Sequence, residues 1–148
     1  MGLGEVVLGF IGGGIVTYLA QNYIRIIDED VKLLNDHIDD LETLEQSAIA
    51  YWLSSAKHLS HEDKCLRARI YGALSVADCF RPSAERLLGC NGKEYFALDA
   101  ELYDIATGGD FETQSKKMDP DRAAEIIKVA HKMRSVLRRS RRSMYWFR

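Results

Sequence analysis

The stretch IRIIDEDVKLLNDHIDDLETLEQSAIAYW, residues 24–52, decides the fold because its apolar residues recur three or four positions apart. They are Ile24, Ile27, Val31, Leu34, Ile38, Leu41, Leu44, Ala48 and Trp52. This spacing places all of them on one face of an α-helix. No glycine or proline interrupts residues 15–71, so we expect the preceding segment to continue directly into this helix.

The other face of the predicted helix is acidic. It carries Asp28, Glu29, Asp30, Asp36, Asp39, Asp40, Glu42 and Glu45. A solvated surface is the usual meaning of such a run, and an acidic vestibule beneath a cation-conducting ring of several copies is the alternative. Asp28, Asp36, Asp39 and Asp40 lack a matching helix of E-x-x-H type, so a two-metal centre is not expected.

Helical signals also dominate the rest of the chain. Ser60 resembles an N-cap, followed by a helix to Phe80, a short helical turn over residues 83–88, and an Asn91-Gly92 turn. Two further helices are expected, over residues 95–106 and from Pro120 into the C-terminal end. Since no stretch alternates with period two, the sequence predicts an all-α bundle of four or five helices.

The N-terminal segment is predicted to be a membrane anchor. Residues 2–20 contain one charge, Glu5, and as a helix they would cover roughly 28 Å, close to the ~30 Å of a hydrocarbon core. A cleaved signal peptide and a buried core helix are the alternatives. Arg25 and Lys32 follow the span and no basic residue precedes it, which favours an outward N-terminus and a cytoplasmic bundle. We therefore predict a single-pass bacterial inner-membrane protein, with an anchor over residues 1–23, a stalk helix, and a bundle within residues 24–148.

Glycines in this segment indicate close helix packing. Gly9, Gly13 and Thr17 are four residues apart and share one helical stripe, with Glu5 one turn earlier. We interpret the stripe as a surface for self-association, although glycine is also generally frequent in membrane helices. A single span cannot enclose a pore, so any channel requires a homo-oligomer.

No recognised catalytic arrangement is present in the sequence. The histidines His37, His58, His61 and His131 and the cysteines Cys65, Cys79 and Cys90 form no motif of nucleophile, base or metal ligands. We expect no catalytic residues, no cofactor and no metal, and we expect the three cysteines to be reduced thiols.

Basic and aromatic residues gather at the C-terminal end. The candidate membrane-interface or phosphate-binding residues are Arg138, Arg139, Arg141, Arg142, Tyr145 and Trp146. Docking on anionic lipid fits such a set, because juxtamembrane basic residues each gain about 1 kcal/mol at an anionic surface. A solvated or intersubunit basic helix paired with the acidic stalk, and RNA binding, remain open as alternatives.

The layout of span, stalk and helical bundle resembles the small membrane effectors that accompany RNA-targeting CRISPR nucleases of subtype VI-B. That resemblance implies an oligomeric pore lined by N-terminal helices and a HEPN-like bundle. The HEPN ribonuclease signature places four to six residues between Arg and His, whereas eight residues separate Arg122 from His131. A second pattern combines Ala48, Tyr51 and Trp52 with residues 107–112, as in some bacterial single-span proteins, and carries no transferable function.

The sequence thus predicts a non-enzymatic effector that oligomerises through its span and permeabilises or depolarises the membrane, in antiphage defence. The expected partners are the lipid bilayer, further copies of the chain, and a CRISPR or other defence protein. A membrane-tethered scaffold and a degenerate HEPN-like nucleic-acid binder are the alternative functions.

Overall fold

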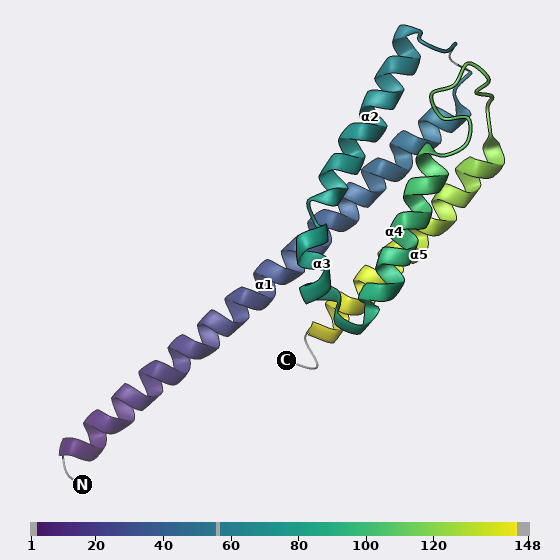
Figure 1. Cartoon of the computed structure of the whole chain (residues 1–148). Helices are drawn as coiled ribbons and strands as arrows, with labels where there is room; N and C mark the ends of the chain where they lie inside the picture. Colours follow the sequence, from purple (N-terminus) through teal and green to yellow (C-terminus); the bar gives the residue numbers. More distant parts are fainter. Residues whose placement is uncertain (1–2, 56, 145–148) are drawn as a thin grey trace. The chain divides into compact units, whose positions relative to one another are not determined.

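The computed structural model describes the backbone of residues 3–55 and 57–144, and side chains within these ranges from residue 16 onward. The described elements are the α-helices α1 (Leu3–Leu53), α2 (His61–Asp78), α3 (Arg81–Leu88), α4 (Gly92–Thr107) and α5 (Pro120–Met144), and the 3-10 helix η1 (Gly89–Asn91) (Figure 1). No strand occurs among the described residues, which confirms the all-α prediction. The chain divides into two compact units, Met1–Lys32 and Leu33–Arg148, which are described separately.

The first unit is the N-terminal part of α1. Within the described part of the chain, none of the helices contains a stretch long and apolar enough to cross a bilayer. The predicted span, residues 1–23, falls mostly on residues 1–15, whose side chains lie outside the described part.

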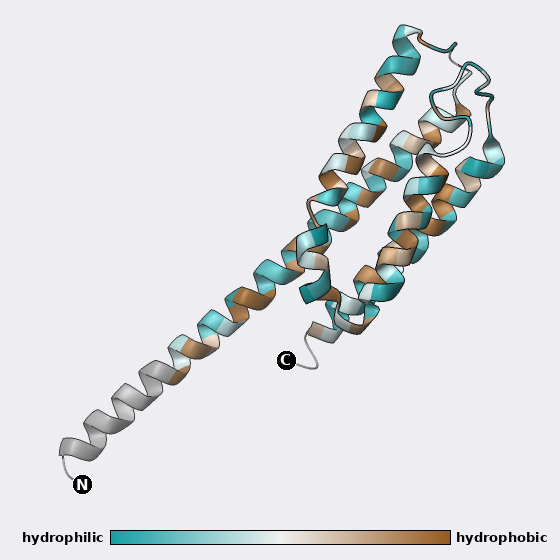
Figure 2. Cartoon of the chain, in the orientation of Figure 1, coloured by the Kyte–Doolittle hydropathy of each residue, from teal (hydrophilic) through white to brown (hydrophobic). Residues whose placement is uncertain are grey.

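The second unit is the helical bundle, formed by the C-terminal part of α1 together with α2, α3, α4 and α5. Six of the nine apolar residues that predicted the long helix lie in this unit, and all six are buried: Leu34, Ile38, Leu41, Leu44, Ala48 and Trp52. They meet buried side chains of the other helices, among them Ile70, Leu102, Ile126, Met133 and Leu137. Figure 2 shows apolar and polar residues interspersed along every bundle helix, as expected for helices that bury one face.

Two helix starts follow the predicted capping chemistry. The hydroxyl of Ser60 accepts a hydrogen bond from the Asp63 backbone N–H at 3.2 Å, and the Asp63 carboxylate accepts one from the Leu59 N–H at 3.0 Å. This reciprocal arrangement satisfies one backbone donor in the first turn of α2 and one just before the helix. At α5, the Asp119 carboxylate accepts a 2.9 Å hydrogen bond from the Arg122 N–H, and Pro120 occupies the first helical position.

Residues 81–92 differ from the sequence-based expectation. The short helix α3 begins at Arg81 rather than Ser83, because Pro82 fits the first turn, where its missing N–H costs nothing. The Asn91-Gly92 turn was a wrong prediction: Asn91 ends η1 and Gly92 begins α4 with helical φ of -59°. Gly89, with φ of 52°, makes the change of direction instead.

Candidate functional site

The predicted helix-packing stripe is described only at its last residue. The side chains of Glu5, Gly9 and Gly13 lie outside the described part, while Thr17 is exposed on α1. Large apolar side chains around and after Thr17 are also exposed, by 43% to 67% of their surface. They are Val16, Tyr18, Leu19, Tyr23, Ile24 and Ile26. Residues 16–26 therefore present an apolar helical surface that the folded chain leaves uncovered.

The predicted basic tail is part of the bundle up to Met144, because α5 extends through it. The Arg139 guanidinium lies 2.6 Å from a carboxylate oxygen of Glu94, and Arg141 donates a 2.6 Å hydrogen bond to the side-chain carbonyl of Asn35. Two of the four predicted interface arginines thus hold α5 against α4 and α1. Tyr145 and Trp146 lie outside the described residues.

Acidic α1 and basic α5 are joined within one chain by an ion pair between Glu45 and Arg134. Both side chains are nearly buried, at 12% and 15% exposure, so removal of either partner would leave a charge with little access to water. At this position a basic residue of α5 therefore pairs with the acidic helix α1 of the same chain, inside the bundle.

The outward face of α5 remains basic. Lys128, His131, Lys132, Arg138 and Arg142 are exposed, and none of them forms an ion pair with another described residue. All five lie within about 120° of one another around the helix, so they share one side of it. We call this stripe the basic face, and two of the predicted interface arginines, Arg138 and Arg142, belong to it.

The outward face of α1 in the bundle is acidic. Asp36, Asp39 and Glu42 are exposed, and Asp40 is half-buried. Partial burial, followed by the negative charges of Asp36 and Asp39, raises the pKa of the Asp40 carboxyl. The carboxylates on this face repel one another, so a cation placed beside them would be attracted.

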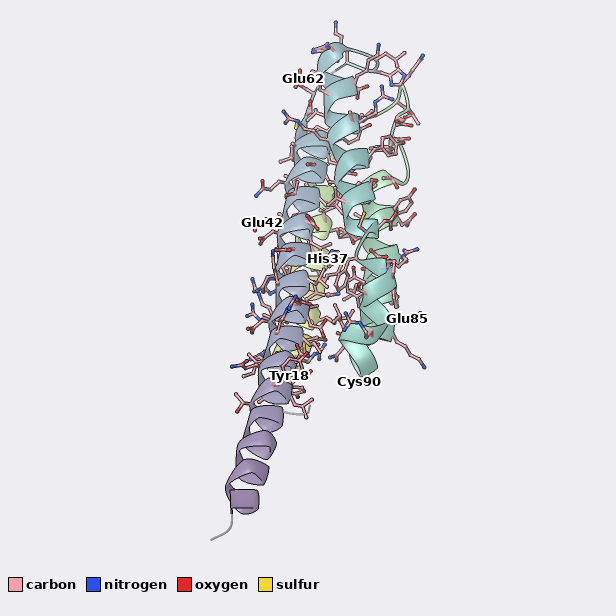
Figure 3. All side chains as sticks on the ribbon, turned by 90° about the vertical axis from the view of Figure 1, so that its left-hand side faces the viewer. Tyr18, His37, Glu42, Glu62, Glu85 and Cys90 are labelled. Carbon is pink, nitrogen blue, oxygen red and sulfur yellow. The ribbon has the colours of Figure 1, made fainter. Side chains whose placement is uncertain are left out.

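A groove runs between α1 and α2 beside these carboxylates. Its volume is about 440 Å³, and its lining consists of Asp40, Thr43 and Ser47 from α1 with Arg69, Gly72, Ala73 and Val76 from α2. Figure 3 views the molecule from this side, with Glu42 at the outer edge of α1 and His37 between the helices. The lining combines a small apolar floor with one acid and one base.

The loop between α4 and α5 packs on Tyr51 and Trp52. The Trp52 indole N–H donates a 3.0 Å hydrogen bond to the Ala106 carbonyl, and the Tyr51 hydroxyl accepts one of 3.0 Å from the Glu112 N–H. Lys116 lies 4.0 Å from the Tyr51 ring centroid. The two sequence segments that were noted together, around Tyr51 and around residues 107–112, are therefore partners in packing.

Arg122 contacts the same region. Its guanidinium lies 4.2 Å from the Trp52 ring centroid and donates a 2.5 Å hydrogen bond to the carbonyl of Gly108, just after α4. Gly109 has φ of +63°, and a Cβ there would meet the guanidinium at 2.6 Å, so glycine is required for this approach. His131 lies nine residues further along α5, about half a rotation around the helix, and is exposed. Arg122 and His131 therefore do not share a site on α5.

Arg122→Met should lower the free energy of unfolding by about 1–2 kcal/mol, because it removes a charged donor to the Gly108 carbonyl and the cation above Trp52. Urea unfolding followed by circular dichroism measures the change. Lys64→Met, at an exposed position of α2, is the matched control and should change stability by less than about 0.5 kcal/mol. Equal effects of the two substitutions would contradict the fastening role of Arg122.

His37 forms a buried pair that the sequence had not singled out. It is 1% exposed, its Nε2 lies 2.6 Å from the Tyr95 hydroxyl, and its ring stacks on Phe80 at 4.0 Å. Its Nδ1 is buried without a hydrogen-bond partner, and burial lowers the pKa of His37 to about 4. The sequence signal for its burial is its position between Leu34 and Ile38, on the apolar face of the helix.

The remaining chemical candidates are not assembled into a site. Within the described ranges, no three of the His, Cys, Asp and Glu side chains are grouped closely enough to hold a metal ion. Cys65, Cys79 and Cys90 are free and exposed. The described part of the chain has instead an acidic face on α1, a basic face on α5, and a groove between α1 and α2.

Comparison with known protein families, curated proteins and solved structures gives no match to this chain.

Proposed function

We propose that this chain is a non-enzymatic effector of the bacterial inner membrane, which assembles copies of itself and thereby changes membrane permeability, in antiphage defence. The observation that carries the proposal is the uncovered apolar surface over residues 16–26 of α1, with Leu19 59% and Ile24 58% exposed. A helix surface of this kind is typical of contact with a membrane or with another helix. It continues, within one helix, the glycine-containing segment before it.

The non-enzymatic part of the proposal is supported by how the bundle uses its polar residues. Arg122 fastens a loop, Arg134 neutralises Glu45, and the His37 ring is enclosed by Phe80 and Tyr95. Groups of these types serve as catalytic acids, bases and anion binders in enzymes. In this bundle these groups contact other residues of the fold. Such contacts favour a function through assembly rather than through catalysis.

A membrane-tethered scaffold is the second candidate, and the groove between α1 and α2 favours it. A groove that holds both Asp40 and Arg69 could receive a helix of a cytosolic partner. The two candidates differ in whether the protein alone alters a bilayer.

Reconstituted full-length protein should release a trapped fluorescent dye from vesicles, and Gly13→Leu should reduce this release to that of empty vesicles. The leucine would separate helices that pack closely on the Gly9 and Gly13 stripe, and lipid does not replace the lost contact. Gly14→Leu is the matched control, because residue 14 lies about 100° around the helix from residue 13, and it should retain most of the release. If the unaltered protein releases no dye, the effector function is contradicted and the scaffold remains as the proposed function.

A further inference from the structure

The C-terminal part of α5 differs in charge from the rest of the bundle. Residues 128–144 contain seven lysines and arginines and no aspartate or glutamate. Three of these arginines contact α1 or α4, and the other four cations belong to the basic face. From Lys128 to Arg142 this face extends over about 21 Å of helix, at about 1.5 Å for each residue.

The basic face carries neither acidic nor apolar side chains. From Lys128 onward, every exposed position in the described part of α5 is occupied by lysine, arginine, histidine or serine. Ile127, the only exposed large apolar side chain in that part of α5, precedes this run. Helices that lie on a membrane surface combine basic residues with apolar ones, which enter the headgroup region. The basic face lacks such residues, so its attraction for a partner is electrostatic.

The face is wide around the helix as well as long. Lys132 and Arg138 form its two edges, about 120° apart, and the small side chain of Ser135 lies midway between them. A flat bilayer would meet only the middle of such a curved face. The two phosphate rows that border a groove of a nucleic-acid duplex would meet both edges. The major groove of B-DNA is about 12 Å wide, close to the diameter of about 10–12 Å of an α-helix with its side chains.

We propose that the basic face of α5 binds double-stranded DNA through its phosphates, with α5 lying along the major groove. Lys132 contacts phosphates of one strand and Arg138 contacts phosphates of the other. Ser135 faces the floor of the groove, where a small side chain allows close approach. The inference goes beyond the proposed function and does not depend on it, because the face is the same whether the chain alters a membrane or recruits a partner.

The carboxylates of the bundle restrict how a duplex approaches. Asp36, Asp39 and Glu42 are exposed on the outward face of α1, where their charges repel phosphates. On α4, the Glu94 carboxylate is neutralised by the Arg139 guanidinium at 2.6 Å. The bundle therefore attracts a duplex at α5 and repels it at α1.

Binding through phosphates weakens steeply with salt, because each neutralised phosphate releases a counterion. Four residues of the basic face are lysine or arginine. A plot of the logarithm of affinity against the logarithm of salt concentration should therefore have a slope of about −4. Attraction by the overall charge of the chain does not account for such binding, since the formal net charge is -2.

Fluorescence anisotropy of a labelled DNA duplex of about 20 base pairs tests the inference, with the full chain in nanodiscs of uncharged phosphatidylcholine. Lys128→Gln together with Lys132→Gln should weaken binding at least about tenfold and bring the salt slope from about −4 to about −2, since two phosphate contacts are lost. Lys64→Gln together with Lys117→Gln is the matched control. It makes the same change of charge at exposed positions outside α5, and it should weaken binding less than about twofold.

Equal weakening by the two double variants, or an unchanged salt slope in the α5 variant, would overturn the inference. Competition against the labelled duplex gives two further outcomes. Stronger competition by duplex RNA, whose major groove is too narrow for side chains to read, or by vesicles of anionic phosphatidylglycerol would also overturn it. Circular dichroism checks that each variant is folded. Dye release is measured separately and bears only on the proposed function.

Discussion

Trp52→Ala is expected to lower the free energy of unfolding of the bundle by about 3–5 kcal/mol. Trp52 is 2% exposed, so truncation leaves a cavity between α1 and the loop that precedes α5. The substitution also removes the donor to the Ala106 carbonyl and the ring beneath Arg122. Because a domain of this size is stable by only about 5–15 kcal/mol, the loss approaches complete unfolding at moderate temperature.

Two further variants show how much of this loss of stability comes from the indole N–H and how much is specific to residue 52. Trp52→Phe keeps most of the ring and loses the indole N–H, so its cost should lie well below that of Trp52→Ala. Leu53→Ala, at the neighbouring residue with 43% exposure, should cost less than about 1 kcal/mol. Chemical unfolding of the three variants measures the order of their free energies of unfolding. A loss at Leu53 equal to that at Trp52 would contradict a specific role of the indole.

The helices of the bundle could be predicted because their signals are local. The three- and four-residue spacing of Leu34, Leu41 and Ile70 with their neighbours directly reports a buried face, and all three are buried. Ser60 and Asp119 act within three residues of their own positions, which explains why both helix starts were predicted correctly. The boundary at Asn91 and Gly92 was missed because these residues have tertiary surroundings that local sequence does not show: the Asn91 side chain donates a 2.9 Å hydrogen bond to the Ser140 hydroxyl of α5, and Gly92 is buried.

The use of the charged residues could not be predicted from local spacing. Glu45 and Arg134 are 89 residues apart in sequence, and Asn35 and Arg141 are 106 apart. Only the packing of α5 beside α1 brings these partners together. Arginines that look like one basic tail in the sequence are therefore divided between internal contacts and the outward basic face.

Acid should destabilise the bundle through His37. Burial lowers the pKa of His37 from 6.5 to about 4, so the folded chain binds this proton less readily than the unfolded chain does. The neutral imidazole contributes its full stability above pH 6.5, and that contribution is lost as the pH falls from 6.5 towards 4. The difference between the two pKa values corresponds to a loss of about 3 kcal/mol. Tyr95 does not offset the loss, because burial raises the pKa of its hydroxyl and keeps it neutral throughout this range.

The control replaces both polar partners, as His37→Phe with Tyr95→Phe. Two apolar rings of similar shape leave no buried donor or acceptor unpaired at this position, so the double variant should fold. Tyr95→Phe alone should be less stable than the double variant, since the His37 ring would lose its one hydrogen-bond partner while its Nδ1 already has none. Urea unfolding at several pH values between 7 and 4 should show a loss about 3 kcal/mol larger in the unaltered protein than in the double variant. Parallel losses in the two proteins would mean that carboxylates, rather than His37, control the acid sensitivity of the bundle.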